Sequence, residues 1–137
     1  ANSAADSMMT RVGNTPDKVQ AVLALSSMST PAVGAAYNRI SGTKPTGFVM
    51  AGLATPLGIK TYLLDESNPL HDGVLWNVVD LGYLAVQATV QALKGTITET
   101  STTMTAGRLG AKNINNREIL LGPALIFNKD NVNNFNY

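Results

Sequence analysis

The stretch HDGVLWNVVDLGYLAVQATVQALKG, residues 71–95, decides the fold because it places a short strand directly before a capped helix. Residues 74–76 form an apolar run that is too short for a helix and is typical of a buried strand end. Asp80 stands where a helix N-cap is expected, and Gly95 stands just after the last turn. A strand therefore leads into a helix that we expect at 81–94.

The expected helix at 81–94 is apolar over most of its circumference. Its polar side chains Gln87, Gln91 and Lys94 recur at a helical spacing that puts them on one narrow stripe, and leucines and alanines occupy the opposite face. Such a helix needs a partner that covers most of its surface.

The same order of strand, short turn and helix occurs twice earlier in the chain. Residues 19–25 and 47–52 are apolar, as expected for parallel strands that are covered on both faces. Thr30 and Thr55 are each followed by proline, which predicts two helices with a threonine N-cap, the first of them ending at Gly42. This alternation is typical of a parallel α/β sheet.

Shorter elements are expected at both ends of the chain. Residues 4–12 have helical spacing and are followed by a stop signal at 13–16. Residues 96–104 are rich in threonine and serine, and we expect a loop or an irregular hairpin there. The remaining expectations are a strand with a turn at 117–123, an apolar segment at 124–127 and a short terminal helix capped by Asn128.

Length and composition indicate one folded domain. The chain has 137 residues, of which 45% are hydrophobic and 14% are charged. A net charge of +1 without a basic cluster argues against nucleic acid or a membrane surface as partners. No apolar run reaches the roughly 18 residues of a membrane span, so no membrane insertion is expected. The absence of cysteine excludes disulfides and thiolate metal ligands.

A ligand of a parallel sheet lies beyond the carboxyl ends of the strands, where helix N-termini present backbone N–H groups and turns carry short polar side chains. The turns after the three expected strands are residues 25–27, 53–55 and 77–80. Ser26, Ser27 and Asn77 can donate and accept hydrogen bonds, as sugar hydroxyls require. Trp76 or Tyr37 would stack on an apolar sugar face if exposed.

Each of these candidates also has a purely structural explanation. Ser26 and Ser27 follow a strand and precede a helix, where serine is common as a turn or cap residue. Trp76 suits the core, and Asp80 suits a cap. Asn77 directly follows an apolar strand end, where a buried amide needs a partner, so a role in the turn and a role in binding both stay open.

No catalytic or metal-binding arrangement is recognisable in the sequence. His71 is the only histidine, so no histidine pair is available for a metal. Neither a nucleophilic triad nor a G-x-G-x-x-G phosphate loop is present. Asp65 and Glu66 are adjacent and therefore point in different directions on a helix, which makes them a poor acid–base pair. We therefore expect neither enzymatic activity nor a cofactor.

Three stretches carry a resemblance to a known family. They are GLATP at 52–56, GVLWNVVDLGYLAV at 73–86 and ILLGPALIFNKDN at 119–131. In this order and spacing they resemble the carboxy-terminal part of bacterial periplasmic sugar-binding proteins. The resemblance is to the rhamnose-binding and autoinducer-2-binding receptors of ABC transporters, and it extends from Val19 to the last residue.

This resemblance implies an incomplete α/β fold, namely the parallel-sheet, three-layer carboxy-terminal lobe of a two-lobed protein that closes around its sugar. Residues 1–137 would then be a fragment, in which 78–95 form a crossing helix that packs on the missing first lobe. The first strand of the second lobe also has no counterpart. The missing lobe or another copy of the chain would cover the helix at 81–94.

The resemblance also implies ligand contacts. They fall on positions that match Leu25, Ser26, Ser27, Ala54 and Asn77. Many members of the family have an acid at the position of Ser26, and an acid or a serine at that of Ala54. This difference predicts fewer hydroxyl contacts in the present chain.

The implied function is that of the substrate-binding component of a sugar ABC transporter. Such a protein is exported to the periplasm or another extracytoplasmic location, with its leader outside this chain, and delivers a sugar to an ABC permease. Two alternatives stay open. One is the effector-binding lobe of a sugar-responsive transcription repressor, and the other is a self-standing oligomeric α/β protein that has lost ligand binding.

Overall fold

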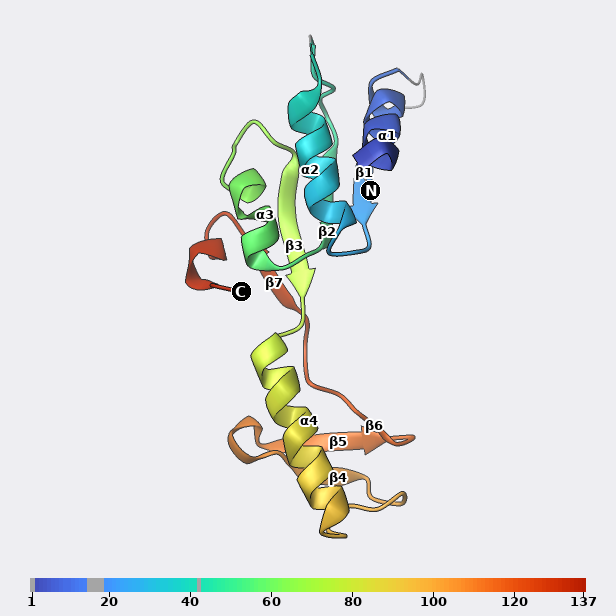
Figure 1. The fold of residues 1–137 in the computed structure, drawn as a ribbon, viewed down its shortest axis with the longest axis vertical. Helices are drawn as coiled ribbons and strands as arrows, with labels where there is room; N and C mark the ends of the chain where they lie inside the picture. The colour runs from blue at the N-terminus through green and yellow to red at the C-terminus, as the bar shows by residue number, and fades with distance from the viewer. Residues whose placement is uncertain (1, 15–18, 42) are drawn as a thin grey trace. The chain divides into compact units, whose positions relative to one another are not determined.

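The computed structural model describes residues 2–14, 19–41 and 43–137. The chain forms two compact units. Unit 1 consists of Ala1–Leu75 and Ile126–Tyr137, and unit 2 consists of Trp76–Leu125 (Figure 1).

Unit 1 contains a four-stranded sheet with the strand order β1-β2-β3-β7. Strand β2 pairs in parallel with both β1 and β3, which confirms the predicted parallel α/β sheet. The elements of this unit are α1 (Asn2–Asn14), β1 (Ala21–Ala24), α2 (Ser29–Arg39), β2 (Val49–Leu53), α3 (Pro56–Leu63), β3 (Leu70–Leu75), β7 (Leu125–Asn128) and η2 (Val132–Asn134).

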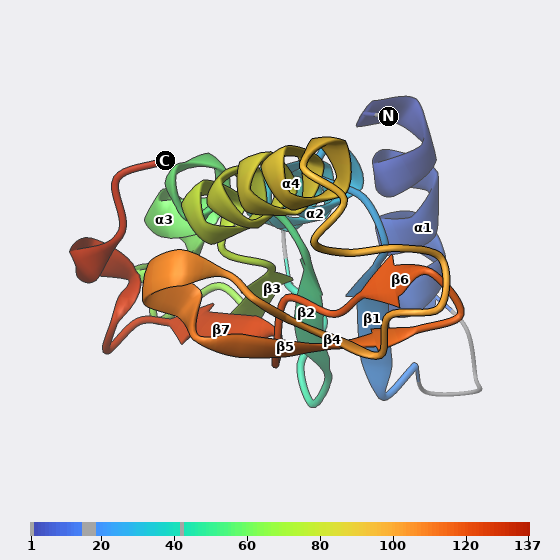
Figure 2. The same cartoon turned by 90° about the horizontal axis from the view of Figure 1, so that it is seen from below.

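One face of this sheet carries helices α2 and α3, and α1 packs against α2 (Figures 1 and 2). Strand β1 shows the consequence, because Val22 and Ala24 are buried whereas Ala21 and Leu23 are exposed. The expectation that β1 is covered on both faces is therefore wrong for the described residues. The apolar composition of β1 could not distinguish a strand with two covered faces from a strand with one.

The core of unit 1 lies between the sheet and its helices. Its largest fully buried side chains include Met50 of β2, Ile59 of α3, Leu70 of β3 and Phe127 of β7. Gly73 of β3 also lies in this core, and a side chain there would collide with the ring of Phe127 and the side chain of Ile59. Strand β3 begins at Leu70, before the predicted apolar run, and ends before Trp76.

The predicted helix starts in unit 1 are right in one case and wrong in the other. Thr55 is the N-cap of α3, where its Oγ1 accepts a hydrogen bond from the Gly58 backbone N–H at 3.3 Å, and Pro56 opens the helix. Thr30, in contrast, is the second residue of α2, whose N-cap is Met28. Its hydroxyl bonds the ends of two strands instead, which no local pattern indicated.

Several predicted boundaries differ from the structure by a few residues. Helix α1 ends at Asn14, and the rest of the predicted stop, residues 15 and 16, lies outside the described residues. Helix α2 ends at Arg39, and the predicted stop Gly42 also lies outside the described residues. The terminal helix is a single 3-10 turn with Asn131 as its N-cap, so the expected cap Asn128 is wrong.

Unit 2 combines one long helix with a small antiparallel sheet of strand order β4-β5-β6. Its buried residues are Leu84 of the helix together with Met104, Ala106 and Ile114. The loop or irregular hairpin predicted at 96–104 runs into β4, which pairs antiparallel with β5, a strand that was not expected. The elements are α4 (Val78–Leu93), β4 (Thr103–Thr105), η1 (Gly107–Leu109), β5 (Ala111–Asn115) and β6 (Glu118–Ile119).

Both ends of helix α4 have a defined cap residue. Asn77 is the N-cap, so the expectation that Asp80 fills this role is wrong. Asp80 lies in the first turn and forms an ion pair with Arg108 at 2.6 Å. The prediction for Gly95 is confirmed, because this residue follows the C-cap and has a φ of 70°, a conformation that glycine adopts without strain.

Much of the apolar surface of α4 is exposed. Leu84 is its only buried residue, and Val86, Val90 and Leu93 are exposed, the last of them at 84%. Among the described residues, every helix is too short or too polar to cross a lipid bilayer.

Candidate functional site

Two predicted ligand-binding turns lie together at one edge of unit 1. Strands β1 and β2 are parallel neighbours, with Ala24 opposite Gly52, so both carboxyl ends reach the same edge of the sheet. Leu25, Ser26 and Ser27 follow β1, and Ala54 follows β2. The structure thus brings four of the five predicted residues to this edge, whereas Asn77 belongs to unit 2.

Ser26 is engaged in the turn itself. Its Oγ accepts a hydrogen bond from the Ser29 backbone N–H at 3.1 Å and lies 2.9 Å from the Ser29 Oγ. In return, the Ser29 Oγ accepts from the Ser26 backbone N–H at 3.1 Å. This reciprocal pair serves the start of α2 as a capping box does, so the structural role proposed for Ser26 is present. Ser29 is the partner that the sequence did not reveal.

Leu25, Ser26 and Ser27 are all exposed at this edge, and Leu25 and Ser27 are the two whose side chains are not engaged in the turn. Leu25 is 83% exposed, and Ser27 is exposed with a hydroxyl that makes no hydrogen bond to another described residue. An uncommitted hydroxyl beside an exposed apolar side chain provides the two kinds of contact that a sugar offers, through its hydroxyls and its C–H faces. Residues 25–29 and 53–56 include no ionisable side chain, so this edge suits an uncharged ligand.

Ala54 is placed differently from the serines. Its side chain is fully buried, and its backbone N–H donates to the Val74 carbonyl oxygen at 3.4 Å. The residue therefore connects the end of β2 to β3. Its assignment as a ligand contact stays a prediction.

The side-chain amide of Asn77 is hydrogen-bonded through its oxygen but not, among the described residues, through its nitrogen. Its Oδ1 accepts hydrogen bonds from the backbone N–H groups of Val79 and Asp80, both at 3.1 Å. No hydrogen bond to another described residue uses its Nδ2. Asn77 thus combines a capping role with two unused donors, and both of the roles left open by the sequence agree with this geometry.

The two aromatic candidates differ in accessibility. Trp76 is 44% exposed. Tyr37 is only 5% exposed, donates its hydroxyl to the Pro45 carbonyl oxygen at 3.3 Å, and packs edge-on against Phe48. Tyr37 is therefore part of the core and does not offer a stacking surface.

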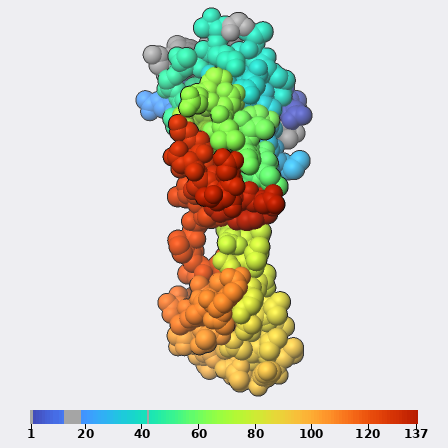
Figure 3. Space-filling view, turned by 90° about the vertical axis from the view of Figure 1, so that its left-hand side faces the viewer, coloured from blue at the N-terminus to red at the C-terminus, as the bar shows by residue number. Residues whose placement is uncertain are grey.

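At the starts of α3 and α4, several of the backbone N–H groups that the sequence led us to expect for a ligand are hydrogen-bonded to other described residues. At α3, the Leu57 N–H donates to the carbonyl oxygen of Tyr137 at 3.2 Å, while the Gly58 N–H donates to Thr55. The C-terminal residues lie over this helix (Figure 3). At α4, the backbone N–H groups of Val79 and Asp80 donate to the Oδ1 of Asn77. The N–H groups of these helix starts that are already bonded are therefore not available to a ligand unless those hydrogen bonds break.

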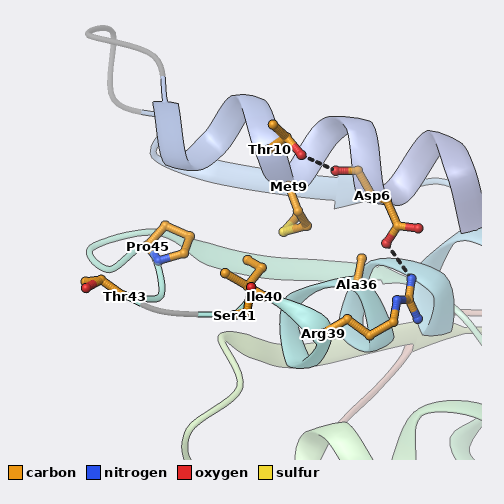
Figure 4. Close-up of a pocket in the computed structure, with 9 residues that line it drawn as sticks. All are labelled: Asp6, Met9, Thr10, Ala36, Arg39, Ile40, Ser41, Thr43 and Pro45. Atoms are coloured by element: carbon orange, nitrogen blue, oxygen red, sulfur yellow. Dashed lines mark hydrogen bonds and ion pairs between the residues drawn. The ribbon is translucent and has the colours of Figure 1, made fainter.

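Two of the grooves on unit 1 bear on the site. One, of about 410 Å³, lies between α1 and the C-terminal end of α2, and Asp6 and Arg39 form an ion pair of 2.6 Å in its wall (Figure 4). It contains none of the predicted ligand-binding residues. The other, of about 350 Å³, lies between α1 and β1 and has mainly apolar walls that include Leu25.

The site has no features of metal or acid–base chemistry. Across residues 2–14, 19–41 and 43–137, no group of three histidine, cysteine or acidic side chains is arranged to hold a metal ion. His71, the only histidine, is exposed on β3. The arrangement can form hydrogen bonds and apolar contacts.

Comparison with known proteins gives matches by structure alone. No family model matches the sequence, and no curated protein matches it significantly. A sugar ABC transporter protein from Actinomyces odontolyticus superposes with a TM-score of 0.80 at 19% identity, over 99% of this chain and 43% of its own.

Two further solved structures agree. LsrB from Clostridium saccharobutylicum in complex with AI-2 gives a TM-score of 0.76 at 17% identity, over 98% of this chain and 44% of its own. An ABC transporter solute-binding protein from Clostridium phytofermentas with bound L-rhamnose gives a TM-score of 0.75 at 21% identity. The match covers 98% of this chain and 45% of that protein. The chain thus spans less than half of each of these proteins, and it has the fold of part of a sugar ABC transporter solute-binding protein.

Proposed function

We propose that the chain is a non-enzymatic, ligand-binding part of the solute-binding component of a sugar ABC transporter. The observation that carries this proposal is the fold, which the three transporter proteins share over at least 98% of the chain. The uncharged edge formed by residues 25–29 and 53–56 supports a neutral, hydroxyl-rich ligand.

In this proposal the ligand-binding positions are those predicted from the sequence, namely Leu25, Ser26, Ser27, Ala54 and Asn77, and the buried Ala54 contributes through the shape of the edge rather than through exposed surface. Ser27 and Asn77 offer the polar groups that intramolecular hydrogen bonds leave unused, and Leu25 offers apolar surface. Each buried polar group that a wrong sugar leaves unpaired costs on the order of 1–3 kcal/mol, which provides specificity. The protein acts outside the cytoplasm and delivers its ligand to an ABC permease.

The exposed apolar surface of α4 is consistent with this role. Val86, Val90 and Leu93 would be covered by the remainder of a two-lobed protein, since an uncovered apolar face of this kind favours association. Sedimentation at several concentrations tests this point. We expect the 137-residue chain to self-associate and the full-length gene product to stay monomeric.

Titration calorimetry tests the proposed function directly. Rhamnose, ribose and an AI-2-type furanose are titrated into the full-length gene product, and we expect binding heat from one of them. Ser27→Ala should weaken that binding, because it removes the uncommitted hydroxyl. Ser7→Ala on the exposed surface of α1 is the matched control and should bind as the wild type does.

Absence of heat from all three sugars would contradict the transporter role. The sequence of the gene upstream of Ala1 provides an independent check. A signal peptide there agrees with the proposal, whereas a helix-turn-helix domain would point to a sugar-responsive repressor.

A further inference from the structure

The hydroxyl of Thr30 joins the two turns at the edge of unit 1. Thr30 is completely buried, and its Oγ1 lies 2.7 Å from the Leu53 carbonyl oxygen, 3.1 Å from that of Ser26 and 3.2 Å from that of Ala24. Ala24 is the last residue of β1, and Leu53 is the last residue of β2. A single donor group therefore contacts the end of each strand and the turn that follows β1.

Gly52 makes this contact sterically feasible. A Cβ atom at residue 52 would collide with the Oγ1 of Thr30, and it would lie 2.6 Å from the Ala24 carbonyl oxygen and 2.8 Å from the Cγ2 of Thr30. The absence of a side chain at this position of β2 gives the threonine its space. The two residues are 22 positions apart in the sequence, so no local pattern links them.

We infer that Thr30 is a positioning residue for the ligand-binding edge, and this inference rests on the proposed function. Its hydroxyl fixes the turn that carries Ser26 and Ser27 relative to the end of β2 that precedes Ala54. Thr30 has no exposed surface and does not itself contact the ligand. It acts through the backbone carbonyl groups that it holds together, and so keeps the site in its binding geometry before the ligand arrives.

Two substitutions separate the hydroxyl from the shape of the side chain. Thr30→Val keeps the branched shape and removes the donor, whereas Thr30→Ser keeps the donor and removes a methyl group. If the inference is right, Thr30→Val weakens sugar binding by the full-length protein about tenfold or more, the scale of one lost buried hydrogen bond. Thr30→Ser should stay within about threefold of the wild type.

Amide hydrogen exchange supplies a measurement that does not need a ligand. The backbone N–H groups of Ser29 and Ala54 report on the two turns, and that of Met50, which donates to the Pro69 carbonyl oxygen at 2.6 Å, reports on the sheet. In Thr30→Val we expect exchange at Ser29 and Ala54 to accelerate at least about tenfold while Met50 is unchanged. In Thr30→Ser all three rates should match the wild type.

The outcomes separate this inference from the proposed function. If the wild type binds none of the sugars, the proposed function fails, and the role of Thr30 in binding falls with it. If the wild type binds and Thr30→Val binds as well as Thr30→Ser, only the inference is overturned. Equal acceleration at Met50 would also overturn it, because the effect would then be general unfolding. Should Thr30→Val not fold, Thr30→Ala compared with Thr30→Ser isolates the same hydroxyl.

Discussion

Asn77 allows the capping and ligand-binding roles of one side chain to be measured separately. Its Oδ1 accepts the N–H groups of Val79 and Asp80, and its Nδ2 is unused by the other described residues. Asn77→Ala removes both functions. Asn77→Ser keeps a capping oxygen of comparable strength but removes the Nδ2 donors.

The magnitude follows from the two backbone groups at the start of α4. Loss of an N-cap costs about 0.5–2 kcal/mol, so Asn77→Ala should lower the free energy of unfolding by about 1 kcal/mol. Asn77→Ser should change it by less than about 0.5 kcal/mol. Both variants should bind sugar about two- to tenfold more weakly, the equivalent of one neutral hydrogen bond.

Urea unfolding of the 137-residue chain, followed by the fluorescence of Trp76, measures the change in the free energy of unfolding that is due to the cap. Trp76 is the single tryptophan of this chain and directly precedes the cap. Titration calorimetry on the full-length protein measures the change in affinity for sugar. Asn113→Ala, at an exposed asparagine of the same unit, is the matched control and should change neither quantity. The reasoning is refuted if Asn77→Ser destabilises as much as Asn77→Ala, or if both variants bind sugar with wild-type affinity.

Two further predictions concern stability. Gly73→Ala forces a methyl group against the ring of Phe127 and should lower the free energy of unfolding, measured in urea, by about 1–3 kcal/mol. The loss should be smaller when Phe127→Leu is added. Gly82→Ala is the control and should not destabilise, because its Cβ would meet no neighbouring group within 4 Å. Hydrogen bonds from the side chain and backbone of Ser67 lower the pKa of Asp65 from 3.8, so the stability that the carboxylate adds above that pH is lost as the pH falls through the folded value. Thermal melts of Asp65→Asn below about pH 4 should therefore depend less on pH than those of the wild type, and equal slopes would contradict this assignment.

Local sequence signals identified those parts of the fold that depend on a few neighbouring residues. Thr55 followed by Pro56 marks the start of α3, and Gly95 marks the end of α4, because capping and positive φ are properties of the local backbone. The alternation of apolar runs and helical spacing identified the parallel sheet for the same reason.

The same kind of reasoning failed where two residues could fill one role. Asp80 and Asn77 are both good N-cap residues, and only the folded backbone shows that Asn77 caps α4 while Asp80 pairs with Arg108. Thr30 has the composition of a cap but bonds the ends of β1 and β2. Burial of Ala54 was equally invisible in the sequence.

The sequence by itself determined the α/β class, the parallel direction of its first three strands and a set of candidate residues for a neutral ligand site. Only the tertiary structure decided which of those residues are accessible, which face of the sheet is covered and how β4, β5 and β6 pair. The reason is physical: local conformation depends on adjacent residues, whereas burial, strand pairing and the partners of a hydroxyl such as that of Thr30 depend on segments far apart in the chain.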